Sequence, residues 1–250
     1  MSKTKSTQLT CVFNNNMNKI SLKGLTEIER NLIFFIIAKM KGQHMNLIEI
    51  PIADLRALMR RDKNYTNDES LQILEALKTH FFALSFDKVS DDGEWIDRMH
   101  LFSVFGVKKD NSAMRVQVNP AFEYIINKLY KGFTQFELEE YFEIHGKYAK
   151  DLYRLLKQFR STGEATWKID DFREEMAIPD AYRTCHIETK VLKPAIKELS
   201  REIYINGTIR NPFPNLSYEK LKSKGRGRGG RVSGIKFTFT PTLAREAKQK

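Results

Sequence analysis

One pattern of eight residues occurs twice in this chain and restricts the folds that it can adopt. Residues 52–59 read IADLRALM and residues 169–176 read IDDFREEM, so that isoleucine, aspartate, arginine and methionine recur at identical spacing. Two ordinary amphipathic helices could share these residue types by chance. A duplicated unit explains the pattern more simply, and it predicts that the elements around each copy recur in the same order.

The first half of the chain contains signals for three helices followed by β structure. Thr26 is a candidate N-cap, because Glu27 and Glu29 follow it and apolar residues then recur at helical spacing. Asn67 can cap the third helix in the same way. Residues 1–17 are polar and rich in asparagine, and we expect them to form a loose N-terminal arm. The expected elements are a helix over residues 26–42, a short strand over 47–52, helices over 53–60 and 67–84, and strands over 95–107 and 114–118.

The second half repeats this order after a linking segment. A helix over residues 120–130 and a strand over 133–141 form the link. The further expected elements are helices over 147–160, 168–178 and 183–201 and a β-hairpin over 216–239. Three helices completed by a β-hairpin are typical of a winged helix. The sequence therefore predicts an α+β protein with two tandem winged-helix domains, over residues 18–130 and 131–245, each made of three helices plus a β-hairpin wing.

The third helix of the second half has a basic side and an apolar side. The polar residues of the basic side are Arg183, His186, Thr189, Lys190, Lys193, Lys197 and Arg201. A row of long basic side chains is what a helix needs to contact phosphates and base edges in the DNA major groove. A solvated face without a ligand is the alternative, since basic helix faces are common. Two residues do not fit: Glu188 projects on the apolar side, and Pro194 removes a backbone donor, so the helix either kinks there or begins later.

The turn between the last two strands is rich in glycines and cations. It contains Gly225, Gly227, Gly229 and Gly230 among the cations Lys220, Lys222, Lys224, Arg226, Arg228 and Arg231. Glycines let the backbone approach a phosphate surface closely, and the cations neutralise that surface or reach into the minor groove. The same letters satisfy a dinucleotide-binding motif, but a strand follows them rather than a helix, and we discard that interpretation. An arginine-glycine tract that binds RNA in a disordered state stays open as an alternative.

The charge balance indicates a polyanionic partner. The chain has 42 lysines and arginines against 31 aspartates and glutamates, which gives a net charge of +11. Nucleic acid is favoured over an anionic membrane surface, because the chain has no lipidation motif and no basic amphipathic terminal helix. The longest apolar run, residues 32–38, is far too short to span a bilayer, and the first residues contain no signal-peptide core. We therefore expect a cytoplasmic protein without membrane association.

Residues that could carry catalysis are few. The five histidines never occur as a close pair, and neither cysteine has a nearby metal-ligand partner, so we expect no metal and no cofactor. The sequence contains no P-loop and no nucleophile elbow. Glu137, Glu139, Glu140 and Glu143 could suggest a metal site, but a solvated strand edge explains them better. The chain is therefore predicted not to be an enzyme.

Three segments of the second half resemble a known family. Residues 148–159 read YAKDLYRLLKQF, and residues 169–173 and 191–198 follow them in order. These segments are similar to the iteron-binding plasmid replication initiators, the theta-type Rep proteins, and the similarity extends to residues 17–86. Pro194 stands where that family also carries a proline. The resemblance therefore covers nearly the whole chain.

This resemblance implies a protein that binds tandem repeats at a plasmid origin as a monomer and represses its own promoter as a dimer. Its first domain would serve dimerisation and phosphate contact, and its second domain would read bases in double-stranded DNA. The host replicative helicase and the host initiator would be further partners. Within the second domain we add Lys147, Lys150 and Arg154 to the residues expected at the DNA.

The two binding modes compete, because a two-fold dimer suits an inverted operator and not direct repeats. We expect the dimer interface on the hairpin over residues 95–118. Its apolar edge residues are Trp95, Ile96, Leu101, Phe102 and Phe105. A dimeric transcriptional repressor without a role in replication shares every DNA-binding feature and is the alternative function.

Overall fold

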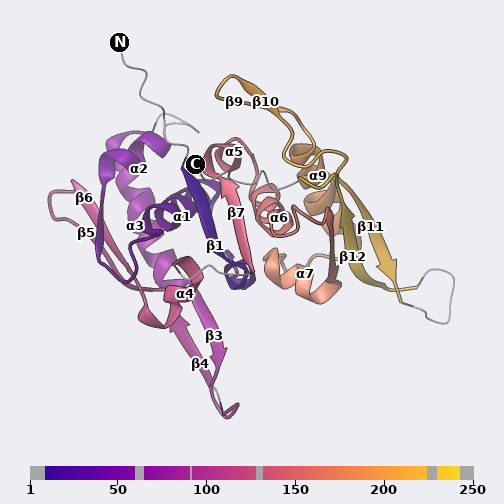
Figure 1. Ribbon diagram of the computed structural model, residues 1–250, viewed down its shortest axis with the longest axis horizontal. Helices are drawn as coiled ribbons and strands as arrows, with labels where there is room; N and C mark the ends of the chain where they lie inside the picture. Colours follow the sequence, from indigo (N-terminus) through magenta and orange to yellow (C-terminus); the bar gives the residue numbers. More distant parts are fainter. Residues whose placement is uncertain (1–8, 60–64, 91, 128–131, 224–229, 243–250) are drawn as a thin grey trace, which may run out of the picture. The chain divides into compact units, whose positions relative to one another are not determined.

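The computed structural model describes residues 9–59, 65–90, 92–127, 132–223 and 230–242 (Figure 1). The chain divides into two compact units, residues 1–138 and 139–250. Both units contain helices and strands, so the fold is α+β, as the sequence predicts. In the described part of the chain, no helix combines the length and the apolar character needed to cross a membrane.

The first unit combines helices with a three-stranded antiparallel sheet of order β2-β6-β5. Its elements are β1 (Thr10–Asn14), the 3₁₀ turn η1 (Asn15–Lys19), α1 (Glu27–Met40), β2 (Ile48–Pro51), α2 (Ile52–Met59), α3 (Asn67–Ala83), β3 (Ser85–Val89), β4 (Ile96–His100), β5 (Phe102–Val107), β6 (Ala113–Val118), the 3₁₀ turn η2 (Pro120–Phe122), α4 (Glu123–Ile126) and β7 (Phe133–Glu137). Leu32 of α1, Leu55 of α2 and Val116 of β6 are fully buried. The apolar sides of α1 and α2 therefore pack against one face of the sheet and form a single core with it.

The two longest helices of the first unit each begin at a threonine. Thr26 accepts a hydrogen bond from the backbone N–H of Glu29, and the Glu29 carboxylate accepts one from the N–H of Thr26 at 2.7 Å. The predicted N-cap of α1 is thus confirmed. For α3 the prediction of Asn67 is wrong by one residue: Thr66 is the N-cap, and the Glu69 carboxylate accepts its N–H at 2.8 Å. A glutamate three residues after a threonine completes a capping box, which satisfies two backbone donors at once.

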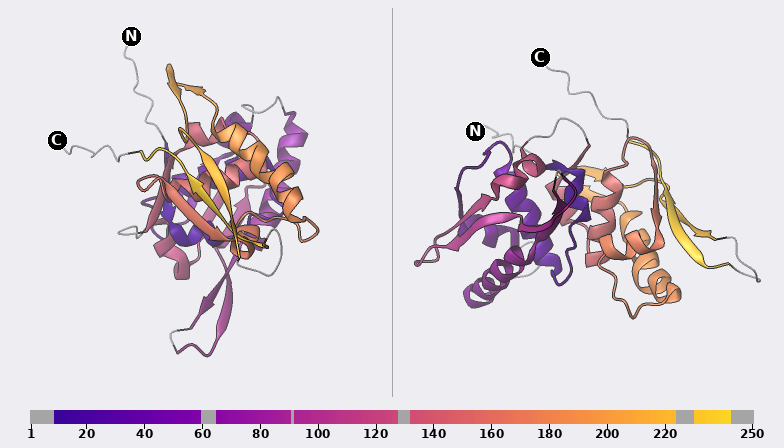
Figure 2. Two further views of the ribbon diagram at one scale, coloured as in Figure 1. Left: turned by 90° about the vertical axis from the view of Figure 1, so that its right-hand side faces the viewer. Right: turned by 90° about the horizontal axis from the view of Figure 1, so that it is seen from below.

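The strand predicted over residues 95–107 is interrupted at Leu101. The Leu101 side chain is fully buried, and its backbone N–H donates to the carbonyl of Leu84 at 3.0 Å. As a result β4 pairs with β3 in one hairpin, while β5 pairs with β6 in the wing. The β3–β4 hairpin extends away from the rest of its unit (Figure 2, left). The first unit therefore has an additional hairpin between its third helix and its wing.

Residues 10–17 are folded, so the prediction of a loose arm over residues 1–17 is wrong for this part. β1 pairs antiparallel with β7, and both Cys11 and Phe13 are fully buried. The ring of Phe13 lies 5.7 Å from the ring of Phe34 in α1. The strand was not predicted because it has only five residues, lies next to a run of asparagines, and pairs with a strand near the end of the unit.

The boundary between the units also differs from the prediction. Because β7 pairs with β1, it belongs to the first unit, and the division falls after residue 138 rather than after residue 130. The strand expected over residues 133–141 ends at Glu137, and α5 (Leu138–Phe142) follows it directly. Of the predicted arm, residues 1–8 lie outside the described part of the chain.

The second unit repeats the order of the first. Its elements are α5 (Leu138–Phe142), α6 (Lys147–Lys157), β8 (Glu164–Lys168), α7 (Ile169–Glu175), α8 (Thr184–Ile187), the π turn η3 (Glu188–Leu192), α9 (Lys193–Leu199), β9 (Ile203–Ile205), β10 (Thr208–Arg210), β11 (Ser217–Lys222) and β12 (Val232–Thr238). The sheet order β8-β12-β11 corresponds to β2-β6-β5. Both α2 and α7, which carry the repeated eight-residue pattern, follow directly on the first strand of their sheet, and both units insert a hairpin before the wing. This agreement supports a duplication rather than chance.

Aromatic rings hold the second sheet against α7. Trp167 of β8, Phe172 of α7 and Phe237 of β12 contact one another with ring centroids 5.8 to 6.3 Å apart. Trp167 and Phe237 alternate with exposed or half-exposed residues along their strands, as expected for one buried face of a sheet. This packing fixes the wing strands next to the helices of the second unit.

Candidate nucleic-acid interface

The third helix of the second unit is continuous from Thr184 to Leu199 through α8, η3 and α9. We call it the recognition helix. Its predicted basic side is solvent-accessible: Arg183, Thr189, Lys190, Lys193 and Lys197 are exposed and His186 is half-buried. Its other side is buried through Ile187, Val191, Leu192, Ala195 and Leu199. The two-sided arrangement follows the prediction, and the burial of one side holds the cationic side outward.

A wider turn accommodates Pro194 in the recognition helix. The backbone N–H of Lys193 donates to the carbonyl of Glu188, five residues earlier, instead of four. Proline has no N–H and its ring crowds the carbonyl of the preceding turn, so a regular α-helix cannot continue through it without a change. Of the two predicted outcomes, a later start of the helix is wrong, because the helix begins at Thr184. Single π turns of this kind occur frequently at functional sites.

Local interactions orient the polar residues in the first half of the recognition helix. The Thr189 hydroxyl donates to the carbonyl of Cys185 at 2.9 Å. His186 accepts the backbone N–H of Arg183 through Nδ1 at 3.3 Å, which caps the helix start. The Lys190 amine lies 5.1 Å from the ring centroid of Tyr182. These side chains are therefore held in defined positions before any ligand arrives.

Glu188 joins the recognition helix to the wing. Its carboxylate accepts a hydrogen bond from the Lys220 amine of β11 at 2.7 Å, and the Lys193 amine lies 3.6 Å from it. The Tyr218 hydroxyl of β11 donates to it at 3.5 Å. The prediction that Glu188 lies on the apolar side is wrong, because its side chain reaches across to the adjacent strand.

These interactions shift three pKa values. The hydrogen bond from Lys220 holds the pKa of Glu188 below its ordinary value, and the same bond raises the pKa of Lys220. Burial, together with the Glu188 charge, raises the pKa of Tyr218. Near neutral pH the carboxylate and the amine therefore both carry their charges, and the ion pair between helix and wing is formed.

The wing strands lie beside the recognition helix (Figure 2, right). Lys222 is the last residue of β11 and Arg231 directly precedes β12; both are exposed, as predicted. Lys224, Arg226 and Arg228 lie outside the described part of the chain. Gly230 has a positive φ of 47°, and a Cβ at this position would stand 2.7 Å from the carbonyl of Ser223. Only glycine fits this close approach at the end of the wing.

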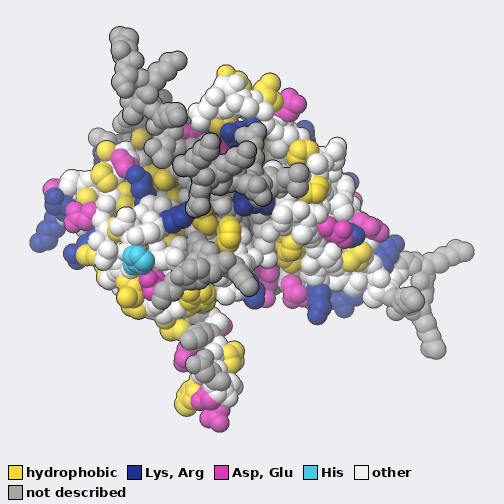
Figure 3. Space-filling model, viewed as in Figure 1, with side chains coloured by type: hydrophobic (Ala, Val, Ile, Leu, Met, Phe, Trp, Pro, Cys, Tyr) yellow, Lys and Arg dark blue, Asp and Glu magenta, His cyan; other side chains and the backbone are white. Residues whose placement is uncertain are grey.

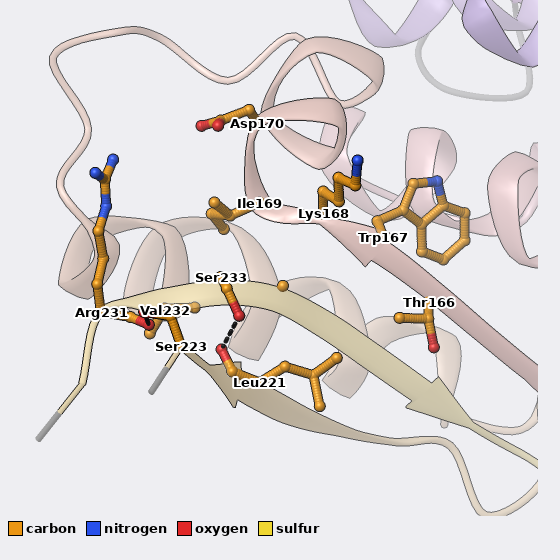
Figure 4. Close-up of a pocket in the computed structure, with 11 residues that line it drawn as sticks. Thr166, Trp167, Lys168, Ile169, Asp170, Leu221, Ser223, Arg231, Val232 and Ser233 are labelled. Atoms are coloured by element: carbon orange, nitrogen blue, oxygen red, sulfur yellow. Dashed lines mark hydrogen bonds between the residues drawn. The ribbon is translucent and has the colours of Figure 1, made fainter. Parts of the chain in front are cut away.

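An open hollow of about 530 Å³ lies along the outer face of the wing sheet (Figure 4). The side chains of Lys168, Asp170 and Arg231 surround it, and they come from β8, α7 and the wing end. Lys168 is exposed and is not among the residues that the sequence predicts at the DNA. The alternation of polar and apolar residues over 164–168 is the signal that could have identified it, because alternation places Lys168 on the outer face of a strand.

Two of the three predicted residues on α6 do not face solvent. Lys150 and Arg154 are fully buried, so neither can contact DNA from this position. The Lys150 amine donates to the carbonyl of Tyr141 at 2.8 Å and lies 4.6 Å from the centroid of its ring. Lys147 is exposed, as predicted. The prediction failed because α6 is enclosed on several sides, and long cationic side chains can lie within a core when their heads find carbonyl oxygens.

The acidic cluster near β7 and α5 is also different from its prediction. Glu140 is buried rather than part of a solvated edge. Its carboxylate accepts a hydrogen bond from the Tyr153 hydroxyl at 2.6 Å and pairs with the Lys157 amine at 2.5 Å. Within the described ranges, no group of three histidine, cysteine, aspartate or glutamate side chains is arranged to hold a metal ion.

The fold and the site together define a class of protein. Each unit has a helix, a strand, two further helices and a β-hairpin wing on a three-stranded sheet. The second unit presents an exposed cationic helix face next to its wing. The molecule is therefore a tandem winged-helix protein with a basic recognition surface on its second unit.

The chain belongs to the family of initiator replication proteins. The family model described as "Initiator Replication protein, WH1" matches residues 10–157, and the model described as "Initiator Rep protein, WH2" matches residues 168–239. Together the two matches cover most of the chain and identify both winged helices. The predicted family and fold class are confirmed. The first match continues beyond residue 138 through α6, a helix that packs within the second unit.

Two known proteins illustrate the relationship. A probable replication protein rep from Bifidobacterium longum (strain NCC 2705) is 29% identical over 247 residues, which are 95% of this chain and 76% of the relative. The crystal structure of the Pi initiator protein in complex with iteron DNA has a TM-score of 0.66 over 94% of this chain and 98% of that chain, at 16% identity. At this identity the likeness concerns the fold.

Proposed function

We propose that this replication initiator binds double-stranded DNA and reads bases with the recognition helix of its second unit. The observation that carries the proposal is the helix from Thr184 to Leu199, whose buried side anchors an exposed row of cations. A helix presented in this way fits the major groove, while the wing beside it approaches the adjacent phosphates. The similar Pi initiator is described in complex with iteron DNA, which agrees with this use of the fold.

The first unit offers a weaker electrostatic surface on its corresponding helix, α3. Gln72 and Glu75 are exposed there, and Lys78 is 3.3 Å from the Glu75 carboxylate. A helix with paired charges gains less from releasing counterions around DNA than a row of cations does. This contrast supports a division of work in which the first unit contacts phosphates and the second unit specifies the sequence.

We propose further that the chain binds tandem repeats at a plasmid origin as a monomer and represses its own promoter as a dimer. The family resemblance of residues 148–159 and 191–198 motivates this proposal. The host replicative helicase and the host initiator are its proposed partners in the cytoplasm. These activities need binding surfaces rather than catalytic groups.

The first unit supplies a surface suited to the proposed dimer. On the β3–β4 hairpin, Val89, Trp95 and Ile96 are 57, 67 and 75% exposed, and Val89 and Ile96 are direct cross-strand partners. Hydrophobic and acidic side chains lie together along this hairpin on the face shown in Figure 3. A two-stranded ribbon with apolar residues exposed has marginal stability alone, so a protein partner would stabilise it.

The interface predicted from the sequence needs one correction. Leu101, Phe102 and Phe105 are buried in the core of the first unit and cannot form an edge for another chain. Only Trp95 and Ile96 of that predicted set are exposed. The proposed interface is therefore restricted to the β3–β4 hairpin, and the β5–β6 wing is not part of it.

Footprinting on the DNA that flanks the gene tests the proposed function. An initiator of this kind should protect several tandem repeats at regular spacing, and a separate inverted site near the promoter. A repressor without a role in replication would protect the promoter site alone. The control is a Lys193→Ala chain, which should need a higher protein concentration to protect either kind of site. The proposal would be contradicted if the Lys193→Ala chain still bound RNA and the wild-type chain protected no duplex.

A further inference from the structure

We propose that Glu188 is a positioning residue that sets the DNA-binding specificity of the second unit by restraining Lys193 and Lys220 between the recognition helix and the wing. The inference rests on the proposed function, because it concerns the same DNA-binding surface. It assigns a role to an acidic residue in the middle of a cationic surface, where a carboxylate would otherwise only repel phosphates.

The ion pairs of Glu188 connect two elements that must bind DNA together. One carboxylate oxygen accepts from Lys220 of β11 at 2.7 Å, and the other lies 3.6 Å from the Lys193 amine of the recognition helix. The Tyr218 hydroxyl donates to the same carboxylate from β11. Rigid placement of wing and helix relative to one another fixes which base edges the helix can reach.

The π turn makes this arrangement possible. In a regular α-helix, residues five positions apart point about 140° away from each other, and their side chains do not meet. In η3 the backbone N–H of Lys193 bonds to the carbonyl of Glu188, so these two residues share one widened turn. Pro194, which stands next to Lys193, cannot donate the bond that would restore a regular turn. The proline thus favours the backbone geometry in which Glu188 and Lys193 can pair.

The consequence for binding differs between random and cognate DNA. On random DNA the phosphates compete with Glu188 for the two lysines, so each phosphate must first break an ion pair. On cognate DNA a base edge can attract Lys193 from its longer 3.6 Å ion pair, while Lys220 keeps its 2.7 Å bond. The carboxylate therefore weakens non-specific binding more than specific binding, and specificity is a difference of these two affinities.

The test compares Glu188→Gln with Glu219→Gln in the full-length chain. Both changes remove one negative charge from the same region, but Glu219 is exposed on the opposite face of β11. The probes are a duplex selected from a random pool by the wild-type chain and a random duplex of equal length. Affinities for both probes are measured at several salt concentrations, and thermal unfolding is measured in parallel.

Glu188→Gln should bind the random duplex more tightly, and its salt slope should steepen by about 0.9 for each lysine that gains a phosphate. The ratio of selected to random affinity should fall by roughly ten-fold, which corresponds to one good base contact. Glu219→Gln should leave this ratio unchanged. The double variant Glu188→Lys, Lys220→Glu restores the ion pair with its charges exchanged. Its ratio of selected to random affinity should therefore be higher than that of either single variant.

Two results would overturn the inference. The first is a Glu188→Gln chain that keeps the wild-type ratio of selected to random affinity; if it also loses affinity for both probes equally and unfolds at a lower temperature, Glu188 has a structural role only. The second is a Glu219→Gln chain whose ratio falls as much as that of Glu188→Gln. A wild-type chain without preference for its selected duplex would overturn the proposed function as well, and this outcome is separate from the other two.

Discussion

Lys190 and Lys193 present their amines on the exposed side of the recognition helix, one beside the Tyr182 ring and one beside Glu188. We predict that Lys193→Ala or Lys190→Ala weakens binding to the cognate repeat by about 1 to 3 kcal/mol, because a lysine that reads a base contributes on this scale. Binding to a random duplex should fall less. Titration of both duplexes by fluorescence anisotropy measures the difference.

The matched control for these variants is Lys39→Ala in α1, which removes one cation from the first unit and its 3.4 Å ion pair with Asp54. It should leave the ratio of cognate to random affinity and the salt slope unchanged. If Lys193→Ala lost equal affinity for cognate and random duplexes, the lysine would contact phosphate alone. This result would contradict the assignment of base reading to Lys193.

Lys150 leads to a prediction about stability rather than about DNA. Its buried amine donates to the Tyr141 carbonyl, so Lys150→Ala leaves that carbonyl without this donor and opens a cavity. We expect the free energy of unfolding to fall by roughly 2 kcal/mol. Urea denaturation measures this change. The exposed Lys147 provides the control, since Lys147→Ala should leave the unfolding free energy almost unchanged; an equal effect of both variants would contradict the burial of Lys150.

At the scale of elements, we propose that the wing and the recognition helix perform different parts of binding. We predict that replacing Arg226, Arg228 and Arg231 by alanine weakens binding to all sequences alike. The slope of affinity against salt should decrease by about 0.9 for each phosphate that the wing no longer neutralises. Gel-shift titrations over a range of salt concentrations measure the slope. An unchanged slope would place the wing tip away from the DNA.

The elements themselves were largely predictable where the signal is local. The α1 cap, the amphipathic recognition helix and the repeated pattern on α2 and α7 were all identified, because capping boxes and helical periodicity act over a few residues. Elements whose limits depend on distant partners were predicted less well. β1 was missed and the strand over residues 95–107 was not divided, since neither feature is visible without its pairing partner.

At the scale of the whole molecule, the duplication provides two corresponding hairpins. The proposed dimer can therefore be tested on the hairpin of the first unit, with the hairpin of the second unit as the control. We predict that Ile96→Glu on the β3–β4 hairpin shifts the protein toward monomer and leaves the second unit folded, because a charge replaces a side chain that is 75% exposed and apolar. Operator binding should decrease, while binding to direct repeats should hold or increase. Analytical ultracentrifugation and gel shifts on inverted and direct repeats measure these changes.

The control is Ile209→Glu on β9–β10, the hairpin at the corresponding place in the second unit. Ile209 is 65% exposed and pairs across the strands with Tyr204, which is 71% exposed, so the two substitutions are closely matched. The Ile209→Glu protein should remain dimeric. An Ile96→Glu protein that stays dimeric, or that becomes monomeric and loses both kinds of site together, would contradict the proposed interface.

Spacing and charge along the chain were enough to predict the repeated order of elements, the two-sided recognition helix and the class of ligand. These properties are present before the chain folds. Which cations reach solvent, and where the units divide, became clear only from the folded arrangement. Lys150 and Lys193 are both lysines on amphipathic helices, yet one is buried and one is exposed.

The physical reason is that burial and pairing depend on residues far apart in sequence. Asn18 donates to Thr134 across 116 residues, and Glu188 reaches Lys220 across 32 residues. A periodic pattern indicates that a helix has a packing side, but it does not specify how much of the helix its neighbours enclose. Only the folded chain, by surrounding α6 and bringing β11 next to the π turn, determines which charges meet a carbonyl, a carboxylate or the solvent.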